Sequence, residues 1–256
     1  MNESFKKSKI YRAMRTVVAL AFWLGIWWIA AARMNKELLI PGPLVVLKRI
    51  GVLVTGSAFW VKTGVSFLRV LGGFALGCVT GTILAVVAAV WDMADAVISP
   101  FIRVLRSTPV TSFIILVMLW LSYTYVPVFI ASLLVAPVVY MNLREGIGAT
   151  DRKLLEVARI FRFGRVKTIK TVYIPSVKPY FISAAVTSVG LAWKVGIAAE
   201  VLCLPSNSIG REIYYSKMYL ETPDLFAWTL VVIFFSFCLE KIFGLVVKRR
   251  GNDENS

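Results

Sequence analysis

Histidine is absent from this chain of 256 residues, and cysteine occurs only three times. Histidine is the commonest acid–base group and metal ligand of proteins, so its absence argues against most catalytic and metal-dependent chemistry. Cys78, Cys203 and Cys238 lie in or next to apolar segments, with the spacing of neither a disulfide framework nor a metal cluster. The sequence also lacks the GxxxxGK[ST] phosphate loop, so any ATP that drives this protein must be bound by another chain.

Acidic residues are few, since 14 Asp and Glu stand against 29 Lys and Arg, for a formal net charge of +15. Hydrophobic residues make up 58% of the chain, and the mean hydropathy is +0.76. This apolar fraction exceeds that of ordinary soluble domains. A basic chain can bind nucleic acid, but here the basic residues stand between apolar runs and not on one soluble face. The pattern indicates a protein in contact with membrane lipid, whose cytoplasmic loops follow the positive-inside rule, and not a nucleic-acid binder.

Six apolar stretches have the length and composition of membrane-spanning helices. The first of them could also end in a signal-peptidase site at residues 30–32, but an uncleaved span suffices because the chain that follows is itself apolar. The sequence therefore predicts an all-α polytopic membrane protein with about six transmembrane helices. The predicted spans are residues 16–32, 70–91, 107–121, 127–143, 179–204 and 225–247.

Six crossings place both chain ends on the same side of the membrane. If that side is the cytoplasm, the N-terminal tail, residues 92–106, residues 144–178 and the tail with Lys248, Arg249 and Arg250 face inward, and they hold most of the Lys and Arg. The first outer loop fits this assignment less well because it carries several basic residues. We expect cytoplasmic termini, since the positive-inside rule is a bias summed over loops.

Three glycines at four-residue spacing, Gly73, Gly77 and Gly81, fall on one face of the second predicted span. Small residues at this spacing let helix backbones approach closely within lipid. Packing inside one subunit is the favoured interpretation, and a dimer face is the alternative.

Charged residues inside the predicted spans are candidates for a transport pathway, because intramembrane charges are costly and are kept for function or pairing. Lys194 and Glu200 lie in the fifth span, six residues apart, which is not the three- or four-residue spacing of a helical pair. They could line the pathway, pair structurally, or, for Glu200, lie near the outer interface. Arg69 and Lys194 could attract an anion. Arg69 could equally extend to the outer interface, which we expect.

The segment 144–178 joins the fourth and fifth predicted spans and is amphipathic. Thr150 or Asp151 can cap a helix start, and Gly164 can adopt the left-handed conformation that ends it. A second short helix is expected to end before Pro175. The loop could lie on anionic lipid, or its apolar ridge could dock in a groove of another protein. The predicted ridge comprises Leu154, Leu155, Ala158 and Phe161.

Glu156-Val157-Ala158, with an Ile-Pro pair that ends nineteen residues after Glu156, resembles the EAA loop of permease subunits of binding-protein-dependent ABC importers. LLEVAR at residues 154–159 is typical of the nitrate/taurine/alkanesulfonate group of that family. The family has glycine at position 162, where this chain has Arg162, and Gly164 follows two residues later. The likeness covers about residues 38–247. Further similar stretches are Ile40-Pro41-Gly42-Pro43, Ser66-Phe67-Leu68-Arg69-Val70, Gly73-Phe74, Leu105-Arg106-Ser107-Thr108-Pro109, Leu191-Ala192-Trp193-Lys194 and Ala199-Glu200.

The resemblance implies that the loop is a coupling helix lying in a cleft of a cytoplasmic ATPase. Leu154, Leu155, Ala158 and Phe161 would then form the docked ridge. Glu156 would pair with a basic group, and Gly164 would supply the turn. Ala158 would be small because the cleft is tight.

The resemblance also implies an assembly in the bacterial cell (inner or plasma) membrane. It comprises two permease subunits, two cytoplasmic ATPase subunits that bind ATP and Mg, and an extracytoplasmic substrate-binding protein. A permease homodimer is expected, with a heterodimer as the alternative. This chain itself would be no enzyme and hold no cofactor. Its parts would be a tail and first span over residues 1–37, a transmembrane domain over 38–247, and a cytoplasmic tail over 248–256.

The function implied is that of the permease subunit of an ATP-driven importer, which forms the pathway and transmits ATPase motion through the EAA-like loop. The substrate would be a small anion or small organic molecule of the sulfonate, taurine, nitrate or vitamin-precursor type. An ion-coupled secondary transporter is the alternative, but it would usually show inverted repeats with broken helices. A membrane enzyme would need clustered acids, nucleophiles or metal ligands. A membrane scaffold would not need the EAA-like loop.

Overall fold

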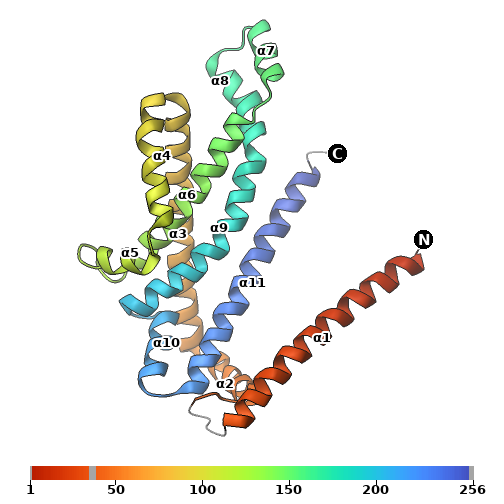
Figure 1. Cartoon of the computed structure of the whole chain (residues 1–256), viewed down its shortest axis with the longest axis vertical. Coiled ribbons are helices and arrows are strands. Elements are labelled where there is room, and N and C mark those ends of the chain that lie inside the picture. The colour runs from red at the N-terminus through yellow and green to blue at the C-terminus, as the bar shows by residue number, and fades with distance from the viewer. Residues whose placement is uncertain (1, 35–38, 254–256) are drawn as a thin grey trace. The chain divides into compact units, whose positions relative to one another are not determined.

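A computed structural model describes residues 2–34 and 39–253, with side chains for residue 11, residues 14–34 and residues 39–245. Residues 254–256 of the predicted tail and the side chains of Lys248, Arg249 and Arg250 lie outside these ranges. Every regular element in the described ranges is helical (Figure 1). The elements are α1 (Asn2–Met34), α2 (Pro43–Thr55), α3 (Ser57–Val90), α4 (Asp92–Ser107), α5 (Val110–Val117), α6 (Val126–Gly148), α7 (Arg152–Ile160), α8 (Arg165–Thr168), the π-helix η1 (Ile169–Tyr173), α9 (Ile174–Cys203), α10 (Ile209–Met218) and α11 (Thr222–Asp253).

The described helices include five that are long and apolar enough to cross a membrane, and a bent pair that could form a sixth span. The prediction of an all-α polytopic protein is therefore confirmed. The chain divides into a smaller unit, Met1–Trp60 with Glu212–Leu230, and a larger unit, Val61–Arg211 with Val231–Ser256. The five long segments are Met14–Met34, Ser57–Val90, Val126–Gly148, Arg165–Cys203 and Thr222–Leu245.

The third predicted span, residues 107–121, differs from the structure. α4 already begins at Asp92, and it meets α5 at an angle of 103°. The break falls at Pro109, which lacks an N–H and disfavours helical geometry in Thr108, whose ψ is 135°. α5 has eight residues and so rises about 12 Å, which is too little to cross a hydrocarbon core of about 30 Å.

In the larger unit, α3 and α6 touch through the glycine stripe of α3. A β-carbon added to Gly73 would lie 2.5 Å from the carbonyl oxygen of Val128. One added to Gly77 would lie 2.6 Å from Cβ of Val135. One added to Gly81 would lie 2.5 Å from the carbonyl oxygen of Ala136. Since real β-carbons do not approach so closely, this face of α3 requires glycine, and it packs against a helix of the same subunit.

α9 packs along α6 and closes the core of the larger unit. Its Trp193 is fully buried, and the indole N–H donates a hydrogen bond to the carbonyl oxygen of Val232 in α11 at 2.9 Å. Gly196 of α9 lies against the Val70 side chain of α3. α5 covers the junction of α6 and α9 with an apolar cluster. The buried members of that cluster are Ile114, Val117, Val126, Ile130, Ala199 and Cys203.

In the smaller unit, aromatic contacts join segments that are distant in sequence. Trp27 of α1 stacks on Phe226, with ring centroids 5.9 Å apart, and its indole N–H donates to the carbonyl oxygen of Pro41. Phe59 stacks on the buried Trp228 at 5.1 Å. Such pairs add to the free energy gained from burying the rings.

The tight glycine contact predicts that Gly77→Val will lower the stability of the protein, because the new side chain overlaps Ser132 and Val135. We expect a loss of about 1–3 kcal/mol, as for other overpacked cores. A thermal unfolding curve in mild detergent measures it. Gly72→Ala is the matched control, since no atom lies within 4 Å of the β-carbon that this substitution adds, and it should leave the curve unchanged or shift it upward.

Candidate functional site

The loop between α6 and α9 folds as a capped helix followed by a tight turn. α7 begins at Asp151, whose carboxylate accepts a hydrogen bond from the backbone N–H of Lys153 at 2.8 Å. At its end, the N–H of Arg162 donates to the carbonyl of Arg159, and the N–H of Phe163 donates to the carbonyl of Ala158. These two bonds form a Schellman motif, whose left-handed position is occupied by Arg162 with φ of 51°.

The left-handed residue of this turn is therefore Arg162, and the prediction that Gly164 supplies it is wrong. Gly164 has φ of −65° and ψ of 160°, an extended conformation open to any residue, and it stands just before α8. The left-handed residue of the turn is thus at position 162, where the family that this chain resembles has glycine. The backbone shape persists although an arginine must adopt it, at some cost in conformational energy.

The apolar residues of the loop divide between two faces of α7. Ala158 is only 3% exposed, so it is buried against its own chain and does not project outward. Phe161 is 69% exposed, and Leu154 is about half exposed, while Leu155 is half-buried. Val157 and Ile160, which the predicted ridge omits, are exposed as well. The outward apolar face of α7 thus comprises Leu154, Val157, Ile160 and Phe161.

The second half of the loop is continuous with the following span. α8, η1 and α9 form one helical segment of 39 residues, Arg165–Cys203. The predicted helix end before Pro175 does not occur, because the N–H of Ile174 bonds to the carbonyl of Ile169, five residues earlier. This wider π turn lets the helix pass through a proline, which has no N–H to give.

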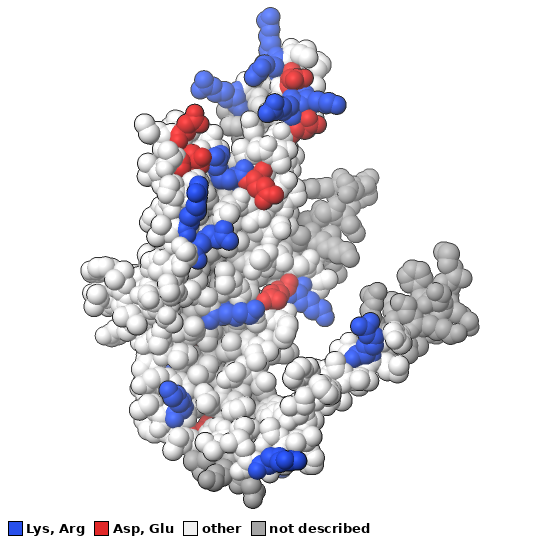
Figure 2. Space-filling view, in the orientation of Figure 1, with Lys and Arg blue, Asp and Glu red and all other residues white. Residues whose placement is uncertain are grey.

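Lys and Arg gather over the end of the larger unit that carries α7 and α8 (Figures 1 and 2). Glu156 is exposed on α7 and, among the described residues, has no ion-pair partner. Lys167 lies over the ring of Phe163 at 4.0 Å from its centroid, which steadies the residue after the turn. The loop therefore presents an apolar face surrounded by positive charge.

At the other end of α9, the structure brings together Arg69 and Glu200, two of the predicted pathway residues. Glu200 is fully buried and forms an ion pair with Arg69, Nη1 to Oε1, at 3.4 Å. Oε2 accepts hydrogen bonds from Ser66 Oγ at 2.7 Å and from the N–H of Gly210 at 3.2 Å. Glu200 and Arg69 therefore pair structurally with each other, and their depth relative to the outer interface stays a prediction.

Lys194 is not part of this cluster. Its ammonium group pairs with Glu240 of α11 at 3.4 Å, and both side chains are largely exposed in the single chain. The Glu240 carboxylate lies over Gly190, where a β-carbon would overlap it. Lys194 and Glu200 therefore do not pair with each other.

Several residues of these clusters were not among the predicted site residues. Glu240 is an acid inside the sixth predicted span, so the rule that singled out Glu200 also applies to it. Ser66 stands three residues before Arg69, on the same side of one helix. Asp95 of α4 accepts a hydrogen bond from Tyr140 of α6 at 3.1 Å and pairs with Arg144 at 3.0 Å. Tyr140 and Arg144 share one face of α6, four residues apart, but no local pattern links them to Asp95.

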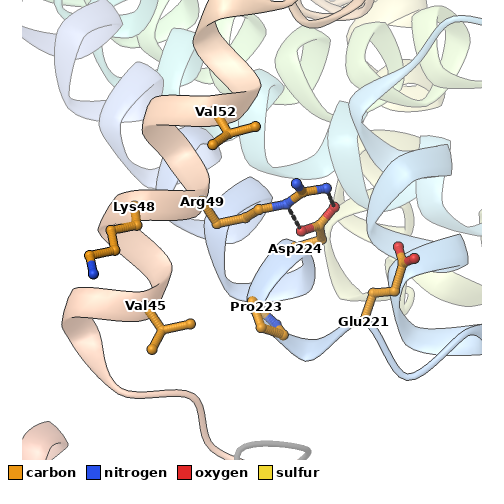
Figure 3. Close-up of a pocket in the computed structure, with 7 residues that line it drawn as sticks. All are labelled: Val45, Lys48, Arg49, Val52, Glu221, Pro223 and Asp224. Carbon is orange, nitrogen blue, oxygen red and sulfur yellow. Dashed lines mark hydrogen bonds and ion pairs between the residues drawn. The ribbon is translucent and has the colours of Figure 1, made fainter.

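The smaller unit contains an open pocket of about 460 Å³ between α2 and the start of α11 (Figure 3). Arg49 points to Asp224 and binds its carboxylate with both Nε and Nη2, while Lys48 points away. The hydrogen bonds to Asp224 raise the pKa of Arg49 above its ordinary value. The pocket thus holds an internally neutralised pair and not a set of converging charges. Val45, Lys48, Arg49, Val52, Glu221, Pro223 and Asp224 line it.

We expect Asp224→Asn to destabilise the protein, because a two-point charge-assisted contact with Arg49 is lost. The loss should be about 1 kcal/mol, since the Arg49 side chain is 41% exposed and solvent weakens the pair. Thermal unfolding at low and high salt measures it, and the difference should shrink at high salt. Glu221→Gln, in the same pocket, is the control, and an equal effect of the two variants would refute the role of the pair.

Arg162→Gly is expected to stabilise the turn after α7, because glycine adopts φ of 51° without the penalty of a side chain. The gain should be about 1 kcal/mol. Hydrogen exchange of the amides of Arg162 and Phe163 reports the turn directly, and it should slow. Arg165→Gly removes the same charge from a helical position, and in this variant exchange of the turn amides should become faster, not slower. Faster exchange in Arg162→Gly would contradict the analysis.

Residues 77–252 match the family model described as binding-protein-dependent transport system inner membrane component. A putative aliphatic sulfonates transport permease protein SsuC of Bacillus subtilis is 25% identical over 225 residues, which cover 87% of this chain and 81% of that protein. The nitrate import permease protein NrtB of Synechococcus elongatus is 26% identical over 208 residues, 77% of this chain and 74% of that protein.

Solved structures show the same fold. An amino acid ABC transporter crystallised with histidines gives a TM-score of 0.62 at 18% identity, over 80% of this chain and 97% of that one. A bacterial ABC transporter involved in the import of the acidic polysaccharide alginate gives 0.61 at 14% identity, over 96% and 98%.

The helical architecture, the apolar spans and the match to more than half of the chain agree. This chain belongs to the family of inner membrane components of binding-protein-dependent transport systems, and within it resembles the permeases of the nitrate and sulfonate type.

Proposed function

We propose that this permease is driven by a separate ATPase chain that docks on the loop 144–178. The observation that carries the proposal is the outward apolar face of α7, formed by Leu154, Val157, Ile160 and Phe161. A short helix with an exposed apolar face is suited to a groove in a partner protein. Its cap at Asp151 and its closed turn at Arg162 keep it rigid without that partner. Glu156 is exposed beside this face and is the group proposed to pair with a basic side chain of the ATPase.

Ala158 has a different part in this proposal from the one the family resemblance implies. Because Ala158 is buried within this chain, its small size fits the packing of the loop itself. Leu155 is half-buried and belongs to the same inner side. Docking then depends on Leu154 and Phe161 of the predicted ridge, together with Val157 and Ile160.

The proposed topology places both termini and the loop in the cytoplasm. Its support is the excess of Lys and Arg in residues 144–178, set against the uncharged segment 122–127. In this arrangement residues 1–37 comprise a tail and the first span, residues 38–247 the transmembrane domain, and residues 248–256 a second tail.

The proposed assembly is a permease homodimer with two ATPase subunits and an extracytoplasmic binding protein. Its support is the family's description as part of a binding-protein-dependent system. ATP and Mg are assigned to the ATPase, because this sequence has no phosphate loop. The permease itself catalyses no reaction in this scheme. It forms the pathway and transmits the motion.

The proposed substrate is a small anion or small organic molecule. The similar permeases described above are named for aliphatic sulfonates and for nitrate, which are small anions. Lys194 is the proposed attracting group, and its largely exposed side chain supports that role. Its partner Glu240 balances the charge, so the pathway would attract anions without binding them tightly.

We expect Phe161→Asp and Leu154→Asp to prevent ATPase binding, since each puts a charge into the apolar face that would be buried on docking. The permease is tagged, co-expressed with its proposed ATPase partner, and purified in mild detergent. The wild type should retain the ATPase at about one to one. Each variant should bind the ATPase at least about tenfold more weakly, which corresponds to about 1.4 kcal/mol of binding free energy.

The matched control is Arg159→Asp, which places the same side chain on the opposite side of α7. It should retain the ATPase. If the wild type binds no ATPase, or if Phe161→Asp and Arg159→Asp behave alike, then the apolar face is not the docking surface.

A further inference from the structure

A fully buried carboxylate lies three residues before the end of α9, and both of its oxygens have partners. Glu200 Oε1 faces Arg69, and Oε2 accepts from Ser66 and from the backbone of Gly210. Arg69 is held in turn, since its Nη2 donates to the carbonyl oxygen of Ser206 at 3.0 Å. A buried charge in a membrane protein needs partners of this kind, because removing the charge from water is costly. These contacts, named here the Glu200 network, join α3, α9 and the chain that follows α9.

The Glu200 network binds the start of α10. The first N–H groups of a helix have no partner within the helix and attract negative charge. Here the N–H of Ile209 donates to Ser66 Oγ at 2.9 Å, and that of Gly210 donates to Glu200. The N–H of Arg211 donates to Ser208 Oγ at 3.2 Å, and Ser208 Oγ donates to the carbonyl of Pro205. Side chains thus satisfy three consecutive amides.

These polar contacts hold the start of α10, which offers little apolar surface for packing. α10 reads IGREIYYSKM, a ten-residue helix with no long apolar face. Gly210 lies directly on the backbone of Glu200 and Val201, where a β-carbon would overlap both. Ser66, Ser208, Ile209 and Glu200 are all fully buried. The start of α10 is therefore fixed to α9 by polar contacts at close range, and it is fixed to α3 through the same carboxylate.

α9 connects this point to the loop. The segment Arg165–Cys203 is continuously helical over 39 residues, and its axis is about 58 Å long at 1.5 Å of rise per residue. One end continues from the turn after α7, and Glu200 lies three residues before the other. A displacement of the loop therefore reaches Glu200 through continuous helix.

We infer that Glu200 is a positioning residue that makes the start of α10 move with α9, so that ATPase motion at the loop reaches the opposite end of the permease. The inference rests on the proposed docking of the ATPase on the loop. Arg69 and Ser66 hold Glu200 in place. Weakening the network separates ATP hydrolysis from the arrival of the binding protein, and it leaves the docking of the ATPase intact.

The test uses the whole transporter in lipid vesicles, with its own ATPase and its own purified binding protein. Basal ATP hydrolysis and hydrolysis stimulated by the binding protein are measured for the wild type, Glu200→Gln and Ser66→Ala. We expect the stimulation to fall about tenfold in Glu200→Gln, the effect of one lost charged hydrogen bond, with ATPase stoichiometry unchanged. Ser188→Ala is the control, because its fully buried hydroxyl bonds only to Ala184 of its own helix, and it should be stimulated as the wild type is.

Amide hydrogen exchange of residues 206–211 in the same samples separates transmission from mere folding. Faster exchange there with lost stimulation supports the inference. Faster exchange with full stimulation overturns it, because the network would then be structural alone, and unchanged exchange with full stimulation overturns it too. If Glu200→Gln fails to assemble, Ser66→Ala decides by the same criteria. If the wild type binds no ATPase, the proposed function fails first, and this inference fails with it.

Discussion

The close backbone approach of α3 to α6 is the contact from which the rest of the larger unit follows. Gly73, Gly77 and Gly81 leave no space between the two helices. α6 in turn packs along α9, and Gly196 of α9 meets Val70 of α3. Because these three helices pack so closely, the positions of the residues one or two turns before Gly73 are fixed relative to α9. Ser66 and Arg69 thus reach Glu200, and its carboxylate is buried with partners on both oxygens.

Two kinds of polar contact serve different purposes in this permease. The Glu200 network is buried, multiply bonded and adjacent to a helix start, so it specifies geometry. The pair of Lys194 and Glu240 is more exposed in the single chain, so water can compete with the contact between its two charges. The partly buried pair of Arg49 and Asp224 belongs to the smaller unit and joins α2 to the first turn of α11. The degree of burial distinguishes a fixing contact from one that can open.

Apolar length, glycine spacing and the EAA-like stretch predict the helical class, the positions of most spans and the presence of an amphipathic loop. The failures have physical causes. Pro109 redirects a helix that hydropathy alone extends through it. Pro175 fails to end a helix because a π turn absorbs it. The backbone kept its left-handed residue at position 162 and did not follow the glycine to position 164. Partners across helices, such as Ser66 for Glu200 and Glu240 for Lys194, depend on tertiary packing, which no local pattern encodes.

The π turn at Ile169–Tyr173 has a consequence for the evolution of such permeases. A π turn is an α-helix with one additional residue, and each residue advances a helix by about 100°. One inserted or deleted residue here rotates the whole of α9 relative to the loop, while leaving both helices intact. A relative without the insertion would carry its fifth span in a different rotational phase. Comparing α9 positions among relatives therefore requires a gap within residues 169–173, and that single position offers a route by which one scaffold can acquire a differently lined pathway.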